Sequence, residues 1–496
     1  MLKSSLLEIL RTFTKPELIK FGDFVRSPYF NKKENVTKLF LEIKKYAPVF
    51  ADENLEKEKI WQKLFPGKDY NYGIMKNLIH DGNKLIERFI RLEYSENIEI
   101  RTEHDLLEAL FERNILDLLS RKFASFEKLY SEANFKNIDL DSEIIYYNLN
   151  NVYELKAWSD YSYNPDSNYK DVQRKSSGYF IYSFLLGCFK RYNNIKSKNI
   201  SKHFDEKNDF IESFFENFLQ EEIELIMNFA RKYSSGSNIN VLNCYYLLYK
   251  SISSKENVEN YFNLKQALYK YGNEISNTDL ISLYAGLNNY LLENQSGDIN
   301  TAMEFTDNYK TMMSRNLFLE PNGKLREYRF NMYIYNSCNA DTCDETLKFI
   351  SEYLDKIPEI SRSNSYNFGM ALVHFAKSEF NKSLEFISKI SQNYFDMKYQ
   401  LKNLMLMIYY ELNDYDAFLY SLDTNKHFLN NNKAVDDNSK ESANVFLNLI
   451  SKLFKLRENF NDYDYKKLDI EISKSFIMQR KWFLEKLKEL NLKVIN

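Results

Sequence analysis

The chain contains little glycine and little proline, and this scarcity limits the folds open to it. There are 12 glycines and 7 prolines in 496 residues, against average frequencies of roughly 7% and 5%. These two residues supply most of the sharp turns in proteins. Their scarcity argues against β-sandwiches and glycine-rich α/β folds. It favours long helices joined by corners of Asn, Asp and Ser.

Other absences narrow the class of protein. Four cysteines do not make a disulfide framework, and no run of about 18 apolar residues could span a membrane. The N-terminus lacks the apolar core and small-residue cleavage site of a signal peptide. The net charge of −3 gives no strong basic field for nucleic acid. We therefore expect a cytoplasmic protein without a membrane span.

Motifs for catalysis and for cofactor binding are also missing. The sequence has no GxGxxG, GxxxxGK[ST], HExxH or CxxC motif, and its five histidines show no ligand spacing. His374, and the closest cysteine pair, Cys338 and Cys343, are interpreted as packed core residues. We therefore expect no catalytic residue, no metal and no cofactor. An enzyme whose site matches no known motif is the alternative.

Aromatic residues, by contrast, are abundant. They make up 16% of the chain, with 38 Tyr and 38 Phe. The codon usage of an AT-rich genome explains this number, and a set of aromatic binding surfaces is the alternative. In either case these large side chains give long helices much apolar surface to bury.

Helix signals are clear near the start of the chain. Thr14 and Glu17 in TKPE match a capping box at the start of a helix. The proline in SPYFN is expected to end that helix, and Asn31 to cap the next one. Tyr29 and Phe30 are then expected to plug the gap between these two helices.

The length requires more than one hydrophobic core, because a core stops growing at about 250–300 residues. Polar segments and a change in periodicity divide the chain into four helical regions. We expect an N-terminal helical unit, an irregular helical region, a set of helical repeats and C-terminal capping helices, over residues 1–95, 96–235, 236–430 and 431–496.

A repeated pattern fills most of the third region. A short polar corner, an apolar anchor and a helix recur in SGDINTAMEF, DTCDETLKFI, KSEFNKSLEF and LNDYDAFLYS, with a weaker copy in SKENVENYFN. The anchors are Val258, Ile299, Cys343, Phe380 and Tyr415, and their spacing varies from 35 to 44 residues. Such self-similarity predicts stacked helical hairpins that together bury a continuous core.

The pattern resembles the tetratricopeptide repeat, a helix–turn–helix unit of 34 residues. Gly297 and Asp298 match the corner of that family, Ala302 its small residue, and Pro358 the proline that ends its second helix. Before the fourth anchor, Ala371 stands where two helices must approach closely. Three copies carry a larger residue at the position of Ala302: Tyr261, Thr346 and Phe418.

The resemblance implies an all-α fold. We expect a right-handed solenoid of helical hairpins, similar to tetratricopeptide arrays, with a helical N-terminal unit and a helical C-terminal cap. FVRSPYFN near the start and RKWFLEKLKEL near the end resemble patterns in uncharacterised all-helical bacterial proteins. That second resemblance implies no activity.

The resemblance to tetratricopeptide repeats also implies a binding groove, formed by positions at fixed distances before each anchor. These positions are Tyr328, Asn331, Tyr335, Phe368, Leu372, Phe375, Gln400, Asn403, Met407 and Tyr410. The two asparagines would hydrogen-bond an extended peptide, and the aromatic and aliphatic side chains would line an apolar slot. Alternatively, the protein's own terminal helices fill the groove. Lys and Arg are nearly absent from these groove positions. The carboxylate clamp by which the family holds peptide C-termini is therefore not expected.

The predicted function is that of a non-catalytic scaffold or adaptor, which binds a partner protein or peptide segment in this groove. One alternative is a nucleic-acid-associated repeat protein. Arg480, Lys481 and Lys486 interleave with Trp482 and Phe483, a pattern that could hold a single strand, although an amphipathic terminal helix also explains it. A self-associating structural protein is a further alternative, and the sequence does not predict the oligomeric state.

Overall fold

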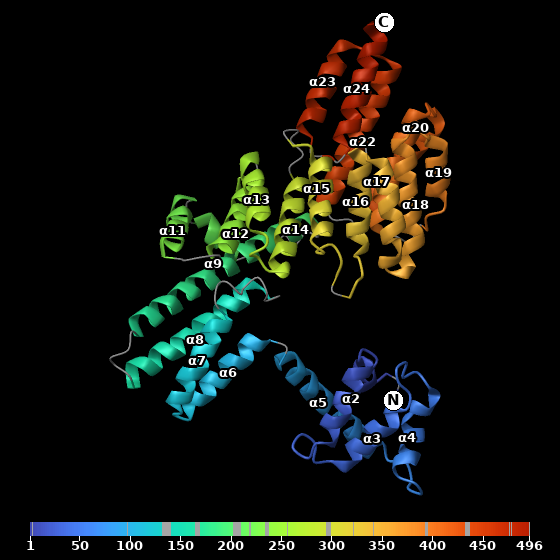
Figure 1. The fold of residues 1–496 in the computed structure, drawn as a ribbon. Helices are drawn as coiled ribbons and strands as arrows, with labels where there is room; N and C mark the ends of the chain where they lie inside the picture. Colours follow the sequence, from blue (N-terminus) through green and yellow to red (C-terminus); the bar gives the residue numbers. More distant parts are fainter. Residues whose placement is uncertain are drawn as a thin grey trace. The chain divides into compact units, whose positions relative to one another are not determined.

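In the computed structural model, the regular secondary structure of the described residues is entirely helical. The structure describes all residues except 2, 97, 131–139, 164–168, 202–209, 218–219, 234–237, 255, 294–298, 321, 341, 392–394, 432–436, 476, 478 and 496. This part of the chain forms 24 α-helices and two short 3-10 helices, with no β-strand (Figure 1). The all-α prediction is confirmed. None of the described helices is both long and apolar enough to cross a membrane.

The chain divides into two compact units. The first unit is Met1–Phe126 and the second is Glu127–Asn496, so the boundary falls within α7, Leu116–Leu129. The finer division into four regions stays a prediction. The other helices of the first unit are α1 Ser5–Leu10, α2 Lys15–Arg26, α3 Glu34–Lys44, η1 Glu53–Leu55, α4 Lys57–Leu64, α5 Tyr72–Glu96 and α6 Glu99–Glu112.

Aromatic rings from α2, α3 and α5 form the centre of the first unit. Phe21 contacts Phe40 and Phe89 with ring centroids 4.9 and 5.2 Å apart, and all three are buried. The capping box at the start of α2 is confirmed. The Thr14 amide donates to Glu17 Oε2 at 2.6 Å, and the Glu17 amide donates to Thr14 Oγ1 at 3.4 Å. The cap thus fixes where the helix that carries Phe21 begins.

The prediction that Asn31 caps the third helix is wrong. Helix α3 begins at Glu34, and Lys33 stands at its N-cap position. Asn31 instead forms an Asx turn, in which its Oδ1 accepts a hydrogen bond from the Lys33 amide at 2.9 Å. Its Nδ2 donates to the Val25 carbonyl at 2.8 Å. The side chain therefore ties the corner back to the end of α2, where Val25 leaves a carbonyl without a helical partner.

Only one of the two aromatic residues at this corner plugs the gap. The ring of Phe30 stacks on Phe24 at 4.1 Å and lies under the Arg88 guanidinium. Tyr29 is 77% exposed, so its predicted packing role is wrong.

We expect Phe30→Ala to lower the free energy of opening α2 and α3 by about 2 kcal/mol, whereas Tyr29→Ala should change it by less than about 0.5 kcal/mol. Native-state hydrogen exchange of these helices measures both values, and equal effects would contradict the packing described here.

The second unit contains all of the remaining helices. They are α8 Ser142–Tyr163, α9 Tyr169–Ser201, α10 Phe210–Asn217, α11 Gln220–Tyr233, α12 Asn238–Ser253, α13 Val258–Tyr271, α14 Asn277–Glu293, α15 Thr301–Ser314, α16 Glu327–Asn339, α17 Cys343–Tyr353, η3 Leu354–Lys356, α18 Glu359–Ala376, α19 Phe380–Ser388, α20 Phe395–Glu411, α21 Tyr415–Asn431, α22 Asp437–Glu458, α23 Asp462–Lys474 and α24 Arg480–Ile495. From α12 to α22 each helix packs against the next one.

The sequence anchors lie at the beginnings of alternate helices. Val258, Cys343, Phe380 and Tyr415 are the first residues of α13, α17, α19 and α21, and Ile299 lies two residues before α15. The preceding helices also touch one another in two cases, α12 with α14 and α16 with α18, and α20 touches α22, the helix after the last anchor helix. The corner residues Gly297 and Asp298 lie outside the described residues.

The position three residues after the anchor is buried in four of these helices, whatever the size of its side chain. The residues are Tyr261, Thr346, Ser383 and Phe418. The Ser383 hydroxyl donates to the carbonyl of Ala371 at 2.7 Å, so α18 and α19 meet closely at the expected alanine. The Tyr261 hydroxyl reaches Glu304 on α15 at 2.9 Å. A larger residue is accepted here because it contacts the neighbouring helix.

A buried carboxylate joins four helices in the second unit. Asp279, in the first turn of α14, accepts hydrogen bonds at Oδ2 from the hydroxyls of Ser142 and Ser276, at 2.6 and 2.8 Å. Its Oδ1 lies 2.7 Å from Lys190 Nζ on α9 and 2.9 Å from the Tyr245 hydroxyl on α12. Burial by itself raises the pKa of Asp279, but the Lys190 charge and the hydrogen bonds outweigh burial and lower that pKa. The carboxylate is therefore held in its ionised form.

Candidate functional site

A cavity of about 550 Å³ lies among α16, α18, α20 and α24 of the second unit. Each of the first three helices contributes apolar side chains from one face, and the start of α15 closes one end. The apolar wall consists of Tyr335, Cys338, Phe368, Leu372, Phe375, Leu404 and Met407. Three alternate helices of the repeat region, α16, α18 and α20, therefore line one hollow.

Six of the ten predicted groove residues line this cavity. They are Tyr335, Phe368, Leu372, Phe375, Gln400 and Met407. The other four do not line it. Tyr328 is exposed on α16, while Asn331, Asn403 and Tyr410 are buried in the packing of α16 and α20. The structure thus brings together most of the apolar positions, and it separates the two asparagines from them.

Neither asparagine is placed to bind a peptide in the cavity. Asn403 is 2% exposed, and within the described part of the chain neither atom of its amide has a hydrogen-bond partner. Asn331 is also buried, and its Oδ1 likewise lacks a partner there. Unpaired buried amides are unfavourable by about 1–3 kcal/mol each.

The fourth wall of the cavity is the C-terminal helix α24, which the sequence analysis considered only through the alternative that terminal helices fill the groove. The Trp482 indole nitrogen donates to Glu411 Oε1 at 2.7 Å, and Lys486 Nζ lies 2.9 Å from the same oxygen. The ring of Trp482 meets Tyr410 edge-on at 5.4 Å. Lys481 Nζ donates to the Asn339 carbonyl at 3.2 Å, at the end of α16.

The contacts of α24 place positively charged side chains at the cavity. The lining residues from α16, α18 and α20 include no Lys or Arg. The cations are Arg480, Lys481 and Lys486. Burial alone lowers the pKa of Lys486, but hydrogen bonds to Glu489 and Glu411 outweigh it and raise that pKa. The only sequence signal for this wall was the suggestion that terminal helices fill the groove, and α24 covers one side of it.

The aromatic residues of α24 are unavailable for stacking on nucleic acid. Phe483 is fully buried and meets Phe446 of α22 at 5.6 Å. Trp482 is nearly buried against Tyr410. A single strand needs exposed ring faces, so the amphipathic-helix interpretation of this segment is the one that fits the structure.

The histidine and cysteines considered in the sequence lie in packed surroundings. His374 Nδ1 is 2.6 Å from Glu379 Oε2, and its ring stacks on Phe386 at 5.2 Å. The hydrogen bond from His374 lowers the pKa of the Glu379 carboxyl. A hydrogen bond with Cys343, together with burial, raises the pKa of the Cys338 thiol. Cys338 is therefore a neutral thiol, which is a poor nucleophile and a poor metal ligand.

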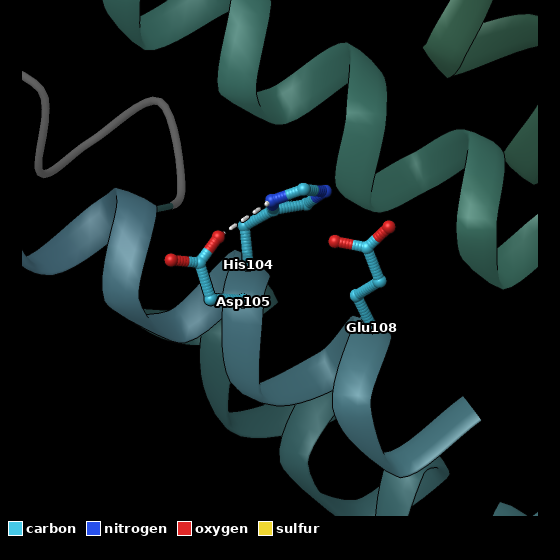
Figure 2. Close-up of side chains that lie close together, drawn as sticks. All are labelled: His104, Asp105 and Glu108. Atoms are coloured by element: carbon cyan, nitrogen blue, oxygen red, sulfur yellow. Dashed lines mark ion pairs between the residues drawn. The ribbon is translucent and has the colours of Figure 1, made fainter. Parts of the chain in front are cut away.

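One group of potential metal ligands lies on α6 in the first unit. Figure 2 shows the imidazole of His104 between the carboxylates of Asp105 and Glu108, with Nδ1 3.4 Å from Asp105 Oδ1. The three ligand atoms lie within 4.8 Å of one another. The sequence analysis did not single out this group, although His104 and Glu108 are four residues apart, a spacing that places both on one face of a helix. All three residues belong to one helical turn and both carboxylates are exposed, which is equally typical of a solvated helix face.

Electrostatics and shape thus distinguish the cavity from the surface group on α6. The cavity combines a buried apolar wall, a cationic edge and a carboxylate that is already paired. Comparisons with known protein families, with curated proteins and with solved structures find no match for this chain.

Proposed function

We propose that the protein is a non-catalytic scaffold or adaptor that holds a segment of a partner protein in the cavity among α16, α18, α20 and α24. The observation that carries this proposal is the convergence of six predicted groove residues on one apolar hollow of about 550 Å³. Ligand pockets fall in the range of about 300–1,000 Å³ and are lined mostly by apolar side chains. A hollow of this size accommodates a few side chains of a bound segment.

We also infer that α12 to α21 form a helical-hairpin array similar to tetratricopeptide repeats. The positions of the anchors at the starts of α13, α17, α19 and α21 support this inference. So does the packing of each helix against its successor. Stacked hairpins present one helix of each pair along a common face, which is where the cavity-lining helices α16, α18 and α20 belong. The right-handed course of the array stays a prediction.

The chemistry of the lining favours binding over catalysis. Glu411 already accepts hydrogen bonds from Trp482 and Lys486, so its carboxylate is not free to take a proton from a ligand. The edge carries three cations but also two carboxylates, Glu411 and Glu485, and this small excess of positive charge favours a segment that carries an acidic residue beside its apolar side chains. The partner class is therefore a peptide segment with an apolar anchor and a neighbouring carboxylate.

Filling the cavity with a new side chain tests this proposal. Ala376, the last residue of α18, is exposed and lines the cavity, so Ala376→Trp should occupy the hollow without disturbing the core. Peptides selected by the wild-type protein from a displayed random library should bind this variant at least about tenfold more weakly, because their anchor has lost its place. Isothermal titration calorimetry measures the affinities.

The matched control places tryptophan on a neighbouring surface. Ser351 on α17 is exposed and does not line the cavity, so Ser351→Trp should leave peptide affinity unchanged. If no peptide is enriched, or if the enriched peptides bind both variants equally well, the cavity is not the docking site.

A further inference from the structure

A second hollow, of about 730 Å³, lies between α8 and α9 and shares no residue with the cavity described above. Its lining is aromatic and polar. The lining residues from α8 are Asn150, Glu154, Ala157, Trp158 and Tyr161, and those from α9 are Tyr169, Gln173, Ser176, Ser177, Phe180 and Ile181. The two helices pack along their length, so the hollow runs over the joint surface of one helical pair.

Helical spacing brings the main groups of the hollow onto two facing stripes. Glu154, Trp158 and Tyr161 lie four and three residues apart, which puts them on one face of α8. Tyr161 meets Trp158 at 6.2 Å and 86°, and it meets Tyr169 at 5.5 Å and 66°. From α9, Phe180 reaches the same hollow. Four rings from the two helices thus line one hollow.

These rings are exposed although they are large. Trp158 and Tyr161 are each 59% exposed, and Phe180 is exposed to a similar extent. The other two tryptophans, Trp61 and Trp482, are nearly buried. Clustered exposed aromatic side chains mark binding surfaces more often than scattered ones do. A ligand that covers ring faces would remove this unfavourable exposure.

The charge of the lining selects the ligand. Glu154 is the only charged side chain among the lining residues, and in the described part of the chain it makes no ion pair or hydrogen bond. Three basic residues of these two helices are paired with other carboxylates. Lys175 pairs with Glu127 at 2.9 Å, Arg174 pairs with Asp171 at 2.9 Å, and Lys156 pairs with Asp160. The hollow therefore offers π faces and one free negative charge.

We propose that this hollow binds a quaternary alkylammonium group, with its cation over the rings of Trp158 and Tyr161 and its counter-charge at Glu154. Aromatic faces attract cations through their quadrupole, and quaternary ammonium is the class of cation recognised in this way. A primary ammonium is strongly hydrated, so it gains less from rings that offer no acceptor. Nucleic acid does not fit, because no cation lines the hollow to meet a phosphate. This inference is independent of the proposed adaptor function.

Choline and its uncharged isostere test the proposal. Choline and 3,3-dimethylbutan-1-ol have nearly the same shape, and only choline carries a charge. We expect choline to bind the full chain and the neutral alcohol to bind at least about tenfold more weakly, because only the cation gains from the rings and from Glu154. Quenching or enhancement of the exposed Trp158 fluorescence reports binding, and calorimetry confirms the affinity. Equal binding of the two compounds, or no binding of choline, would overturn the proposal.

Variants on the same helical pair assign the site. Trp158→Ala and Glu154→Gln should each weaken choline binding about fivefold or more, and calorimetry reads both variants without the indole signal. Glu259→Gln is the matched control, since Glu259 is an exposed glutamate of α13 that lies outside the hollow. It should bind choline as the wild type does. If Glu154→Gln and Glu259→Gln behave alike, the carboxylate of Glu154 is not the counter-charge and the proposed site is wrong.

Discussion

Replacing Asp279 with asparagine is expected to lower the free energy of unfolding of the second unit by about 3 kcal/mol. The substitution removes the negative charge that faces Lys190 in a buried position. Removing one partner of a buried ion pair costs about 3–5 kcal/mol, because the remaining charge is left uncompensated. The lower end of that range applies here because Lys190 Nζ also lies 2.5 Å from Asp141.

The effect should spread beyond α14, because this carboxylate contacts three other helices. Ser142 begins α8, Lys190 is on α9 and Tyr245 is on α12. Burial and the nearby Asp279 charge raise the pKa of Tyr245 well above its ordinary value, so its hydroxyl stays a donor to the carboxylate. Urea unfolding followed by hydrogen exchange across α8, α9 and α12 measures the loss.

Acid titration gives this prediction a second readout. The pKa of Asp279 is lower in the folded protein than in the unfolded chain, where an aspartate titrates at about 3.9. Its stabilisation is therefore complete above that unfolded value, and it is lost as the pH falls through the lower folded value. The difference in stability between the wild type and Asp279→Asn should shrink as the pH falls below about 4. A difference that stays constant with pH would show that charge is not the cause.

Two variants separate the buried charge from a general effect of removing carboxylates. Asp307→Asn is the control, because Asp307 is largely exposed and pairs with Lys265 on the surface of α13. It should change stability by less than about 0.5 kcal/mol. The double change Lys190→Met with Asp279→Asn should recover part of the loss, since no buried charge then remains unpaired and the asparagine amide oxygen still accepts from the two serine hydroxyls. If Asp279→Asn is as mild as Asp307→Asn, the network does not hold the four helices together.

Local features of this fold were predictable from the sequence, because they depend on residues a few positions apart. The capping box of Thr14 and Glu17 and the helices that begin at Phe380 and Tyr415 are of this kind. Asn31 misled the prediction because an asparagine forms either an N-cap or an Asx turn with the same local sequence. The chain direction at that corner, rather than the residue type, decides between them.

Contacts between distant segments were not predictable in the same way. Ser142 and Asp279 are separated by 137 positions, and no local pattern relates them. The same holds for the candidate site. The resemblance to tetratricopeptide repeats placed Phe368, Leu372 and Met407 on a common wall, but nothing in the repeat indicated that α24 would supply another wall. Asn403 shows a further limit, since the resemblance placed it in the open groove and the packing of α20 buries it.

The second large effect concerns α24, the C-terminal helix that forms the fourth wall of the cavity. Trp482→Ala is expected to lower the free energy of opening α24 by about 3–5 kcal/mol, the usual range for truncating a buried large aromatic residue. The indole packs edge-on against Tyr410 and donates to Glu411, so its removal leaves both a void and an unpaired acceptor site. Trp482→Phe retains most of the ring and loses the hydrogen bond, and it should cost only about 1–2 kcal/mol. Hydrogen exchange within α24 measures both changes.

The proposed peptide site and the proposed choline site predict different effects of Trp482→Ala. Opening α24 removes the wall that carries Arg480, Lys481 and Lys486, so peptides selected by the wild-type cavity should lose affinity in Trp482→Ala in proportion to the exchange of α24. Choline binding between α8 and α9 should not change, because Trp482 contributes nothing to that hollow. Faster exchange of α24 with unchanged peptide affinity would show that the segment rests on α16, α18 and α20 alone. Protection of α24 equal to the wild type would show that Phe483, buried against α22, is sufficient to hold the helix, and the predicted role of Trp482 would be wrong.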